Sequence, residues 1–130
     1  MNSKTINSIP FPEPAETKFT FIDLFAGIGG MRIAFQNLGG KCVFSSGIDE
    51  QAKKTYTINF GEVPKGDITK ISANEIPDHD EFGAGFSIVG EKGGFKDSRG
   101  KLCFDVARII KAKQPKALFL ENVNGFGKSR

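Results

Sequence analysis

The residues of this chain most able to do chemistry form a glycine-rich turn, FAGIGG, at positions 25–30. The turn lies between FTFIDLF, residues 19–25, whose aromatic and β-branched content is typical of a buried strand, and a helix predicted from Met31. Glycine lets a ligand approach the backbone, and a helix N-terminus offers free N–H donors. The turn therefore predicts a ligand site. Because Arg32 stands where the third glycine of the dinucleotide fingerprint belongs, a tight turn without a ligand is the alternative.

A second stretch, GAGFSIVGEKGGFKDSRG at residues 83–100, carries little chemistry. Its apolar start runs directly into a glycine-rich basic loop, with no nucleophile, base or metal ligand nearby in the sequence. The residues also suit a parallel strand poorly, because such strands are continuously apolar and Glu81, Gly83 and Gly85 interrupt the run. We expect any strand here to be short or irregular.

The elements that must position the glycine turn alternate between strands and helices. After the first strand we predict a helix with Met31, Ala34, Phe35 and Leu38 on one face, a strand at residues 41–49, a short helix containing Ala52 and Tyr56, a helix at 101–113 and a strand at 116–123. Residues 66–71 could form a short strand or a loop. This alternation indicates an α/β fold with a mainly parallel sheet and FTFIDLF at its centre. We expect a flexible leader at residues 1–17, one domain at 18–126 and a tail at 127–130.

Composition limits the class of protein more than its function. A chain of 130 residues suits one domain, and a net charge of +3 permits a nucleic-acid partner without indicating one. No apolar run approaches the roughly 20 residues that span a membrane, so we expect no membrane partner. Cys42 and Cys103 both lie in apolar settings, which favours buried free thiols over a disulfide and a reducing cytoplasm as the compartment.

Several motifs together resemble, in the same order, those of bacterial cytosine-5 DNA methyltransferases. They are FTFIDLFAGIGGMRIAF, GIDEQAKKTYTINFG, GDI and KGGFKDSRGKLCFDVARIIKAKQPKALFLENV. The resemblance covers residues 19 to about 126. It implies a truncated Rossmann-like methyltransferase sheet, S-adenosylmethionine as the cofactor, double-stranded DNA as the partner and a bacterial, cytoplasmic restriction-modification setting.

The resemblance also implies roles for single residues. In that family the first strand and turn hold the cofactor, and the matching positions here are Phe25 and Ile48 on the two adenine faces, Gly27, Ile28 and Gly30 at the methionine end, Asp67 at the adenine amine and Leu102 in the pocket wall. Aromatic and aliphatic faces can sandwich a base, and a carboxylate can accept from its amino group. Taken alone, Asp67 could be a solvated turn residue and Leu102 simply part of the core.

One departure from the family concerns the ribose of the cofactor. The family carries a glutamate at the position of Gly47, and its carboxylate binds both ribose hydroxyls. Losing such a charge-assisted, two-point hydrogen bond lowers affinity by roughly 1.5–3 kcal/mol, or about 10- to 150-fold. Asp49 is a candidate substitute, because an acid about 20 residues past a glycine turn is the general ribose pattern. We expect S-adenosylmethionine binding to be weak or absent.

The second departure explains the poor chemistry of residues 83–100. Family members read Gly-Phe-Pro-Cys-Gln-Pro-Phe-Ser where this chain reads Gly85-Phe86-Ser87, so the cysteine that attacks the cytosine ring is absent. The cysteines elsewhere lie in apolar elements that disfavour a thiolate. Glu121 and Asn122 match the family's ENV motif, in which the glutamate binds the cytosine edge and the asparagine braces the site. With no nucleophile to assist, Glu121 could equally be a solvated strand-end carboxylate.

The last departure is the length. The chain stops at Arg130, before the arginine motif, the target-recognition region and the C-terminal helix that the resemblance implies. Two hypotheses follow: the cofactor-binding part of a methyltransferase split across two chains, or a non-catalytic scaffold, natural or engineered. We expect exposed apolar surface that promotes self-association or recruits a complementing C-terminal chain, and no catalysis by the chain alone.

Overall fold

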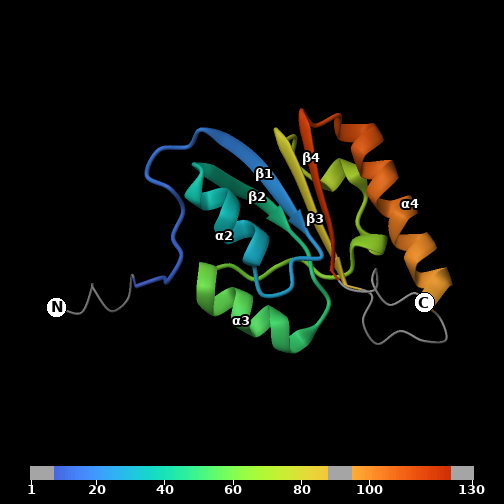
Figure 1. Cartoon of the computed structure of the whole chain (residues 1–130), viewed down its shortest axis with the longest axis horizontal. Helices are drawn as coiled ribbons and strands as arrows, with labels where there is room; N and C mark the ends of the chain where they lie inside the picture. The colour runs from blue at the N-terminus through green and yellow to red at the C-terminus, as the bar shows by residue number, and fades with distance from the viewer. Residues whose placement is uncertain (1–7, 88–94, 124–130) are drawn as a thin grey trace.

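The computed structural model contains one parallel sheet with the strand order β2-β1-β3-β4 (Figure 1). The elements are β1 (Phe19–Leu24), α2 (Gly30–Asn37), β2 (Gly40–Ser45), α3 (Glu50–Phe60), the 3-10 turns η1 (Ile68–Lys70) and η2 (Ala73–Glu75), β3 (Glu81–Ser87), α4 (Phe95–Lys113) and β4 (Ala117–Val123). The structure describes residues 8–87 and 95–123, except for the side chains of 86–87, 95–102 and 122–123. The predicted tail at 127–130 lies outside the described residues. The α/β class and the central position of β1 are confirmed.

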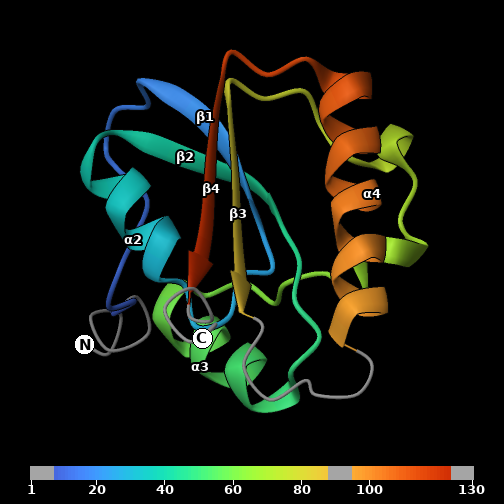
Figure 2. The same cartoon turned by 45° about the vertical axis from the view of Figure 1, so that its right-hand side comes forward.

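The two faces of the sheet are covered by different helices (Figures 1 and 2). On one face, Phe21 of β1 packs with Phe35 of α2 and with Cys42, which gives a small aromatic cluster. On the other face, Ile22 and Leu24 pack in a larger apolar cluster that includes Val106 and Ile109 of α4. Because side chains alternate along a strand, the mainly apolar sequence of β1 supplies both clusters.

The strand β3 corrects the prediction of a short or irregular strand. It pairs in parallel with β1 over four residues and with β4 over seven, without a register shift. The glycine content has a packing reason, because a Cβ on Gly83 would lie 2.7 Å from the Met31 sulfur, 3.0 Å from the Phe35 ring and 3.2 Å from the Ile22 carbonyl oxygen. The glycine therefore lets α2 lie close against the sheet, so it supports this strand instead of opposing it.

We expect Gly83→Ala to lower the free energy of unfolding by about 1–3 kcal/mol, because the added methyl group forces α2 away from the sheet. Gly85→Ala is the matched control, since its Cβ would meet no atom closer than 3.8 Å. That control is expected to be neutral, or to stabilise by up to about 1 kcal/mol. Urea denaturation followed by circular dichroism measures both, and equal stability of the two variants would contradict the packing explanation.

Two further expectations differ from the structure. Leu38, predicted on the buried face of α2, is 67% exposed, while Arg32 and Gln36 are buried with Phe35. Both polar side chains have partners in the interior, because Arg32 donates to Tyr56 of α3 and Gln36 donates to the carbonyl oxygens of Phe11 and Pro12. Cys103, predicted to be buried, is exposed on α4, whereas Cys42 is buried as expected. The GDITKI segment, left open between strand and loop, forms the turn η1.

Part of the predicted leader is attached to the domain. The Phe11 amide donates to the Asn59 carbonyl at 3.0 Å, and the Gln36 side chain donates to the carbonyl oxygens of Phe11 and Pro12, each at 3.1 Å. The Phe11 ring also contacts the Phe60 ring, with centroids 5.9 Å apart. Residues 1–7 of this segment lie outside the described residues.

Candidate functional site

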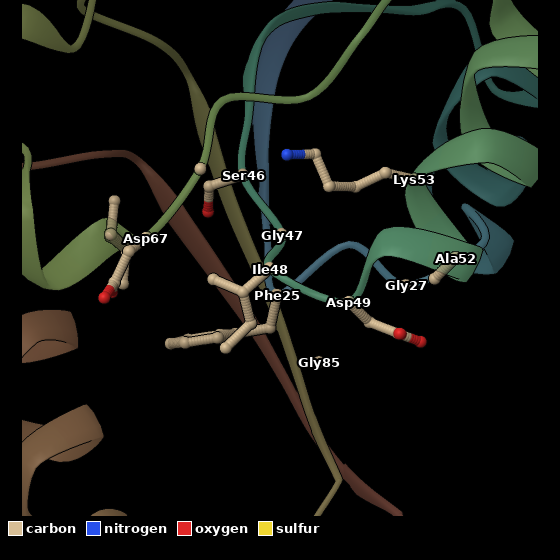
Figure 3. Close-up of a pocket in the computed structure, with 12 residues that line it drawn as sticks. Phe25, Gly27, Ser46, Gly47, Ile48, Asp49, Ala52, Lys53, Asp67 and Gly85 are labelled. Atoms are coloured by element: carbon tan, nitrogen blue, oxygen red, sulfur yellow. The ribbon is translucent and has the colours of Figure 1, made fainter.

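A cavity of about 320 Å3 lies at the carboxyl ends of the strands. Its walls come from the segment after β1, the segment after β2, the turn before η1 and the end of β3 (Figure 3). The chain leaves β1 toward β2 on one side and reaches β3 on the other, so the strand order reverses at this place. Such a switch point is where open α/β sheets bind their ligands.

The glycine turn that follows β1 adopts left-handed backbone conformations. The φ angles are 57° at Phe25, 57° at Gly27 and 99° at Gly29. Phe25 is strained, because a bulky side chain rarely adopts a positive φ. A hydrogen bond of 2.8 Å from the Ala26 amide to the Ser46 carbonyl ties the turn to the end of β2. With this backbone conformation, Phe25 lines the cavity. Strained backbone of this kind is common at ligand-binding sites.

The cavity brings together five of the predicted cofactor residues: Phe25, Gly27, Ile48, Asp49 and Asp67. Ile28 and Gly30 are not among the described lining residues, and Ile28 is 58% exposed on the turn. Leu102 lies in α4, but its side chain lies outside the description. Lining residues that sequence reasoning missed or gave no role in binding are Ser46, Gly47, Ala52, Lys53, Gly66, Ile68 and Gly85. Most are immediate chain neighbours of predicted residues, which is the signal that could have found them.

Asp67 presents a charged acceptor at the cavity. Its Oδ1 atom accepts from the Thr69 hydroxyl at 2.7 Å and from the Thr69 amide at 3.0 Å. These bonds hold the pKa of Asp67 below its usual value, so the carboxylate is ionised at neutral pH. The side chain is thereby fixed in one orientation, as recognition of an amino group requires.

Glu121 lies next to the same site. It is paired with Gly85 in the register of β3 and β4, and its Oε1 atom would lie 3.9 Å from a Cβ on Gly85. Glu121 is not among the described lining residues, and a Cβ on Gly85 would also face the Met31 side chain of α2, at 3.8 Å. Asn122 follows on β4, and its side chain lies outside the described residues.

Neither cysteine lies among the described residues that line the cavity. Burial raises the pKa of Cys42 to about 12, and its Sγ atom donates to the Phe44 carbonyl at 3.4 Å. A thiolate does not form there near neutral pH. Cys103 is exposed on α4. Among the described residues, therefore, no cysteine thiolate faces the cavity.

A buried polar network links β1, α2 and α3, and sequence reasoning did not find it. Tyr56 of α3 donates to Asp23 of β1 at 3.0 Å and accepts from Arg32 of α2 at 3.2 Å. The Arg32 guanidinium also donates to Gln36 at 2.9 Å and to Glu62 at 2.8 Å. The network connects β1, α2 and α3, and thereby holds together the elements on either side of the glycine turn.

The pKa of Asp23 is raised to about 7, because burial outweighs the Tyr56 hydrogen bond and the Arg32 charge that lower it. Between about pH 4 and pH 7 the folded chain holds a proton that the unfolded chain has released, so stability falls as pH rises through this window. We expect Asp23→Asn to remove a fall of roughly 2–4 kcal/mol in the free energy of unfolding between pH 4 and pH 8.

Denaturant unfolding at a series of pH values measures this difference. The matched control is Asp78→Asn, which alters a carboxylate that is 93% exposed and is expected to leave the pH dependence unchanged. An Asp23→Asn variant that retained the full fall would show that Asp23 does not titrate in this range.

The model of the C-5 cytosine-specific DNA methylase family matches residues 19–130. The chain belongs to this family. It is 64% identical over 115 residues to the type II methyltransferase M.HpaII of Haemophilus parainfluenzae, a match that covers 83% of the chain and 32% of that protein. It is 51% identical over 115 residues to M.HhaI of Haemophilus parahaemolyticus, covering 85% of the chain and 35% of that protein.

Solved structures agree with the methylase assignment. The S. pombe Dnmt2 methyltransferase matches with a TM-score of 0.65 and 25% identity, over 87% of this chain and 36% of that one. A putative DNA modification methyltransferase encoded within an E. coli prophage matches with a TM-score of 0.70 and 26% identity, over 86% and 34%. This methylase-family chain thus spans about a third of the length of the relatives it matches.

Proposed function

We propose that the cavity binds the adenosyl part of S-adenosylmethionine, and that the chain is the cofactor-binding part of a cytosine-5 DNA methyltransferase. One observation carries this proposal: Phe25, Ile48 and Asp67 line one cavity at the switch point of the sheet. Two apolar faces suit the adenine ring, and the fixed Asp67 carboxylate suits its amino group. The buried Ser46 hydroxyl, which has no hydrogen-bond partner in the described part of the chain, offers a further polar contact.

Weak binding of S-adenosylmethionine is part of the proposal. Gly47 lines the cavity without a side chain, so no carboxylate from this position reaches the ribose. A Cβ at Gly47 would meet only the Ala26 and Gly27 amide nitrogens, at 3.9 and 4.0 Å, which is ordinary contact. The backbone therefore accepts a larger residue here. Asp49 also lines the cavity, but Figure 3 shows its carboxylate directed away from Ser46.

We expect Gly47→Glu to tighten S-adenosylmethionine binding by about 10- to 150-fold, because the new carboxylate accepts from both ribose hydroxyls. Isothermal titration calorimetry of the chain and its variants measures this. Gly66→Glu is the matched control: it adds the same charge to another part of the wall, where a Cβ meets nothing within 4 Å. Micromolar binding by the unmodified chain, or an equal gain in both variants, would contradict the assignment of position 47 to the ribose.

We propose that double-stranded DNA is the substrate of the complete enzyme and that this chain by itself transfers no methyl group. The reason is chemical: the family's nucleophile is missing at the end of β3, and Cys42 is buried and protonated. Glu121 is paired with Gly85, which lines the cavity, and this supports a role for the acid if a second chain supplies a nucleophile. Leu118, Phe119 and Leu120 of β4 are about half-exposed, which fits such a chain or a second copy.

The compartment belongs to the same proposal. Cys42 is a buried free thiol, and a reducing bacterial cytoplasm keeps such a thiol unmodified. Within the ranges 8–87 and 95–123, no helix combines the length and the hydropathy that crossing a membrane needs.

A further inference from the structure

We propose that Ser46 and Lys53 select an adenosine ligand that carries a phosphate group on its ribose. The inference rests on the proposed function, because it takes the cavity to be an adenosine site. It concerns two polar groups of the cavity other than Asp67, and Figure 3 shows Ser46 between Asp67 and Lys53. The two groups are a buried hydroxyl and a lysine ammonium group, and the cavity lacks a side chain at position 47.

The Ser46 hydroxyl has unused hydrogen-bonding capacity. The residue is 1% exposed, and its Oγ atom has no hydrogen-bond partner in the described part of the chain. Its backbone is fully used, because the Ser46 amide donates to Asp23 at 3.1 Å and the carbonyl accepts from Ala26 at 2.8 Å. The hydroxyl is therefore held in place at the cavity wall, and a bound acceptor would satisfy it.

Lys53 brings a positive charge to the same cavity. It is the only lysine or arginine among the described lining residues, and its side chain is 22% exposed. Its ion pair with Glu50 is long, at 3.7 Å, and the Glu50 side chain is 82% exposed, so this partner competes weakly. Figure 3 shows the Lys53 chain extending from α3 toward Ser46, whereas Asp49 points away from both.

These groups suit an anion better than a diol. Free ribose hydroxyls need an acceptor, and no side chain at Gly47 provides one. A phosphate needs donors, and the Ser46 hydroxyl and the Lys53 ammonium are both donors, the second with a full charge. Asp67, whose carboxylate is held by Thr69, remains the acceptor for the adenine amino group. The cavity thus offers an acceptor for an amine at Asp67 and donors for a phosphate at Ser46 and Lys53.

The test is calorimetric titration of the full chain with adenosine, adenosine 2′-phosphate, 3′-phosphate and 5′-phosphate. We expect at least one ribose phosphate to bind about tenfold or more tightly than adenosine. Lys53→Gln is expected to abolish this gain. Lys54→Gln is the matched control, because it removes the same charge from the next residue, which is exposed and does not line the cavity. Ser46→Ala should reduce the gain.

Gly47→Glu gives an opposite readout in the same assay. It should weaken the phosphate ligands through repulsion while it tightens S-adenosylmethionine. Adenosine binding without a gain from any phosphate, or a gain that survives Lys53→Gln, would overturn this inference and leave the adenosine site intact. Failure of every ligand to bind, including S-adenosylmethionine to Gly47→Glu, would overturn the proposed function as well.

Discussion

Duplex DNA incubated with this chain and S-adenosylmethionine carrying a tritiated methyl group is expected to acquire no label. Carbon 5 of cytosine is a poor nucleophile until a covalent adduct forms at carbon 6, and the resemblance to the family implies a cysteine for that adduct. Here β3 ends in Gly85-Phe86-Ser87, with no cysteine. Cys42 is buried with its pKa raised to about 12, and Cys103 is exposed on α4. We therefore expect no detectable methyl transfer, even with saturating cofactor and DNA.

The control is M.HpaII under identical conditions, since it is a type II methyltransferase with 64% identity to this chain over 115 residues. Label above background from the unmodified chain would contradict the prediction. Loss of that label in a Cys42→Ser, Cys103→Ser variant would then identify one of the two thiols as an unexpected nucleophile. If the variant still labelled the DNA, neither thiol would be the nucleophile.

Arg32→Ala is expected to lower the free energy of unfolding by about 3–5 kcal/mol. Arg32 is 1% exposed, and its guanidinium donates to Gln36, Tyr56 and Glu62 and lies 4.6 Å from the Phe60 ring centroid. Alanine leaves these polar groups without their donor and opens a cavity between α2 and α3. The hydrogen bond to Glu62 and nearby groups raise the pKa of Arg32 against the effect of burial, so the charge is permanent.

Urea denaturation followed by far-ultraviolet circular dichroism is the suitable measurement, because the chain has no tryptophan. Lys41→Ala is the matched control: it removes the same charge from an exposed position of β2 and should change stability by no more than about 0.5 kcal/mol. Similar stability of the two variants would show that the buried network contributes little.

Local sequence patterns by themselves determined the class of fold and most of its elements, although the glycines of β3 led to a wrong expectation for that strand. The run FTFIDLF predicts β1, the apolar repeat before Pro115 predicts most of α4, and the glycine turn marks the ligand end of the sheet. These features are readable because a strand or helix that buries one or two faces repeats its apolar residues with a fixed period. The motifs that resemble the methyltransferases lie in order along the chain, so they too needed no structure.

The tertiary structure alone decided which of the remaining residues act together. Gly83 reads as a flaw in β3 until Met31 and Phe35 of α2 are seen to pack directly against it. In the sequence, Arg32 only interrupts a glycine motif. In the structure it donates to Tyr56 of α3, which donates to Asp23 of β1, so the three elements are connected. Such contacts join residues far apart in the sequence, and no local period encodes them, because they depend on how closely the layers pack. The same holds for the cavity, where the strand order brings residues from four separate segments to one place.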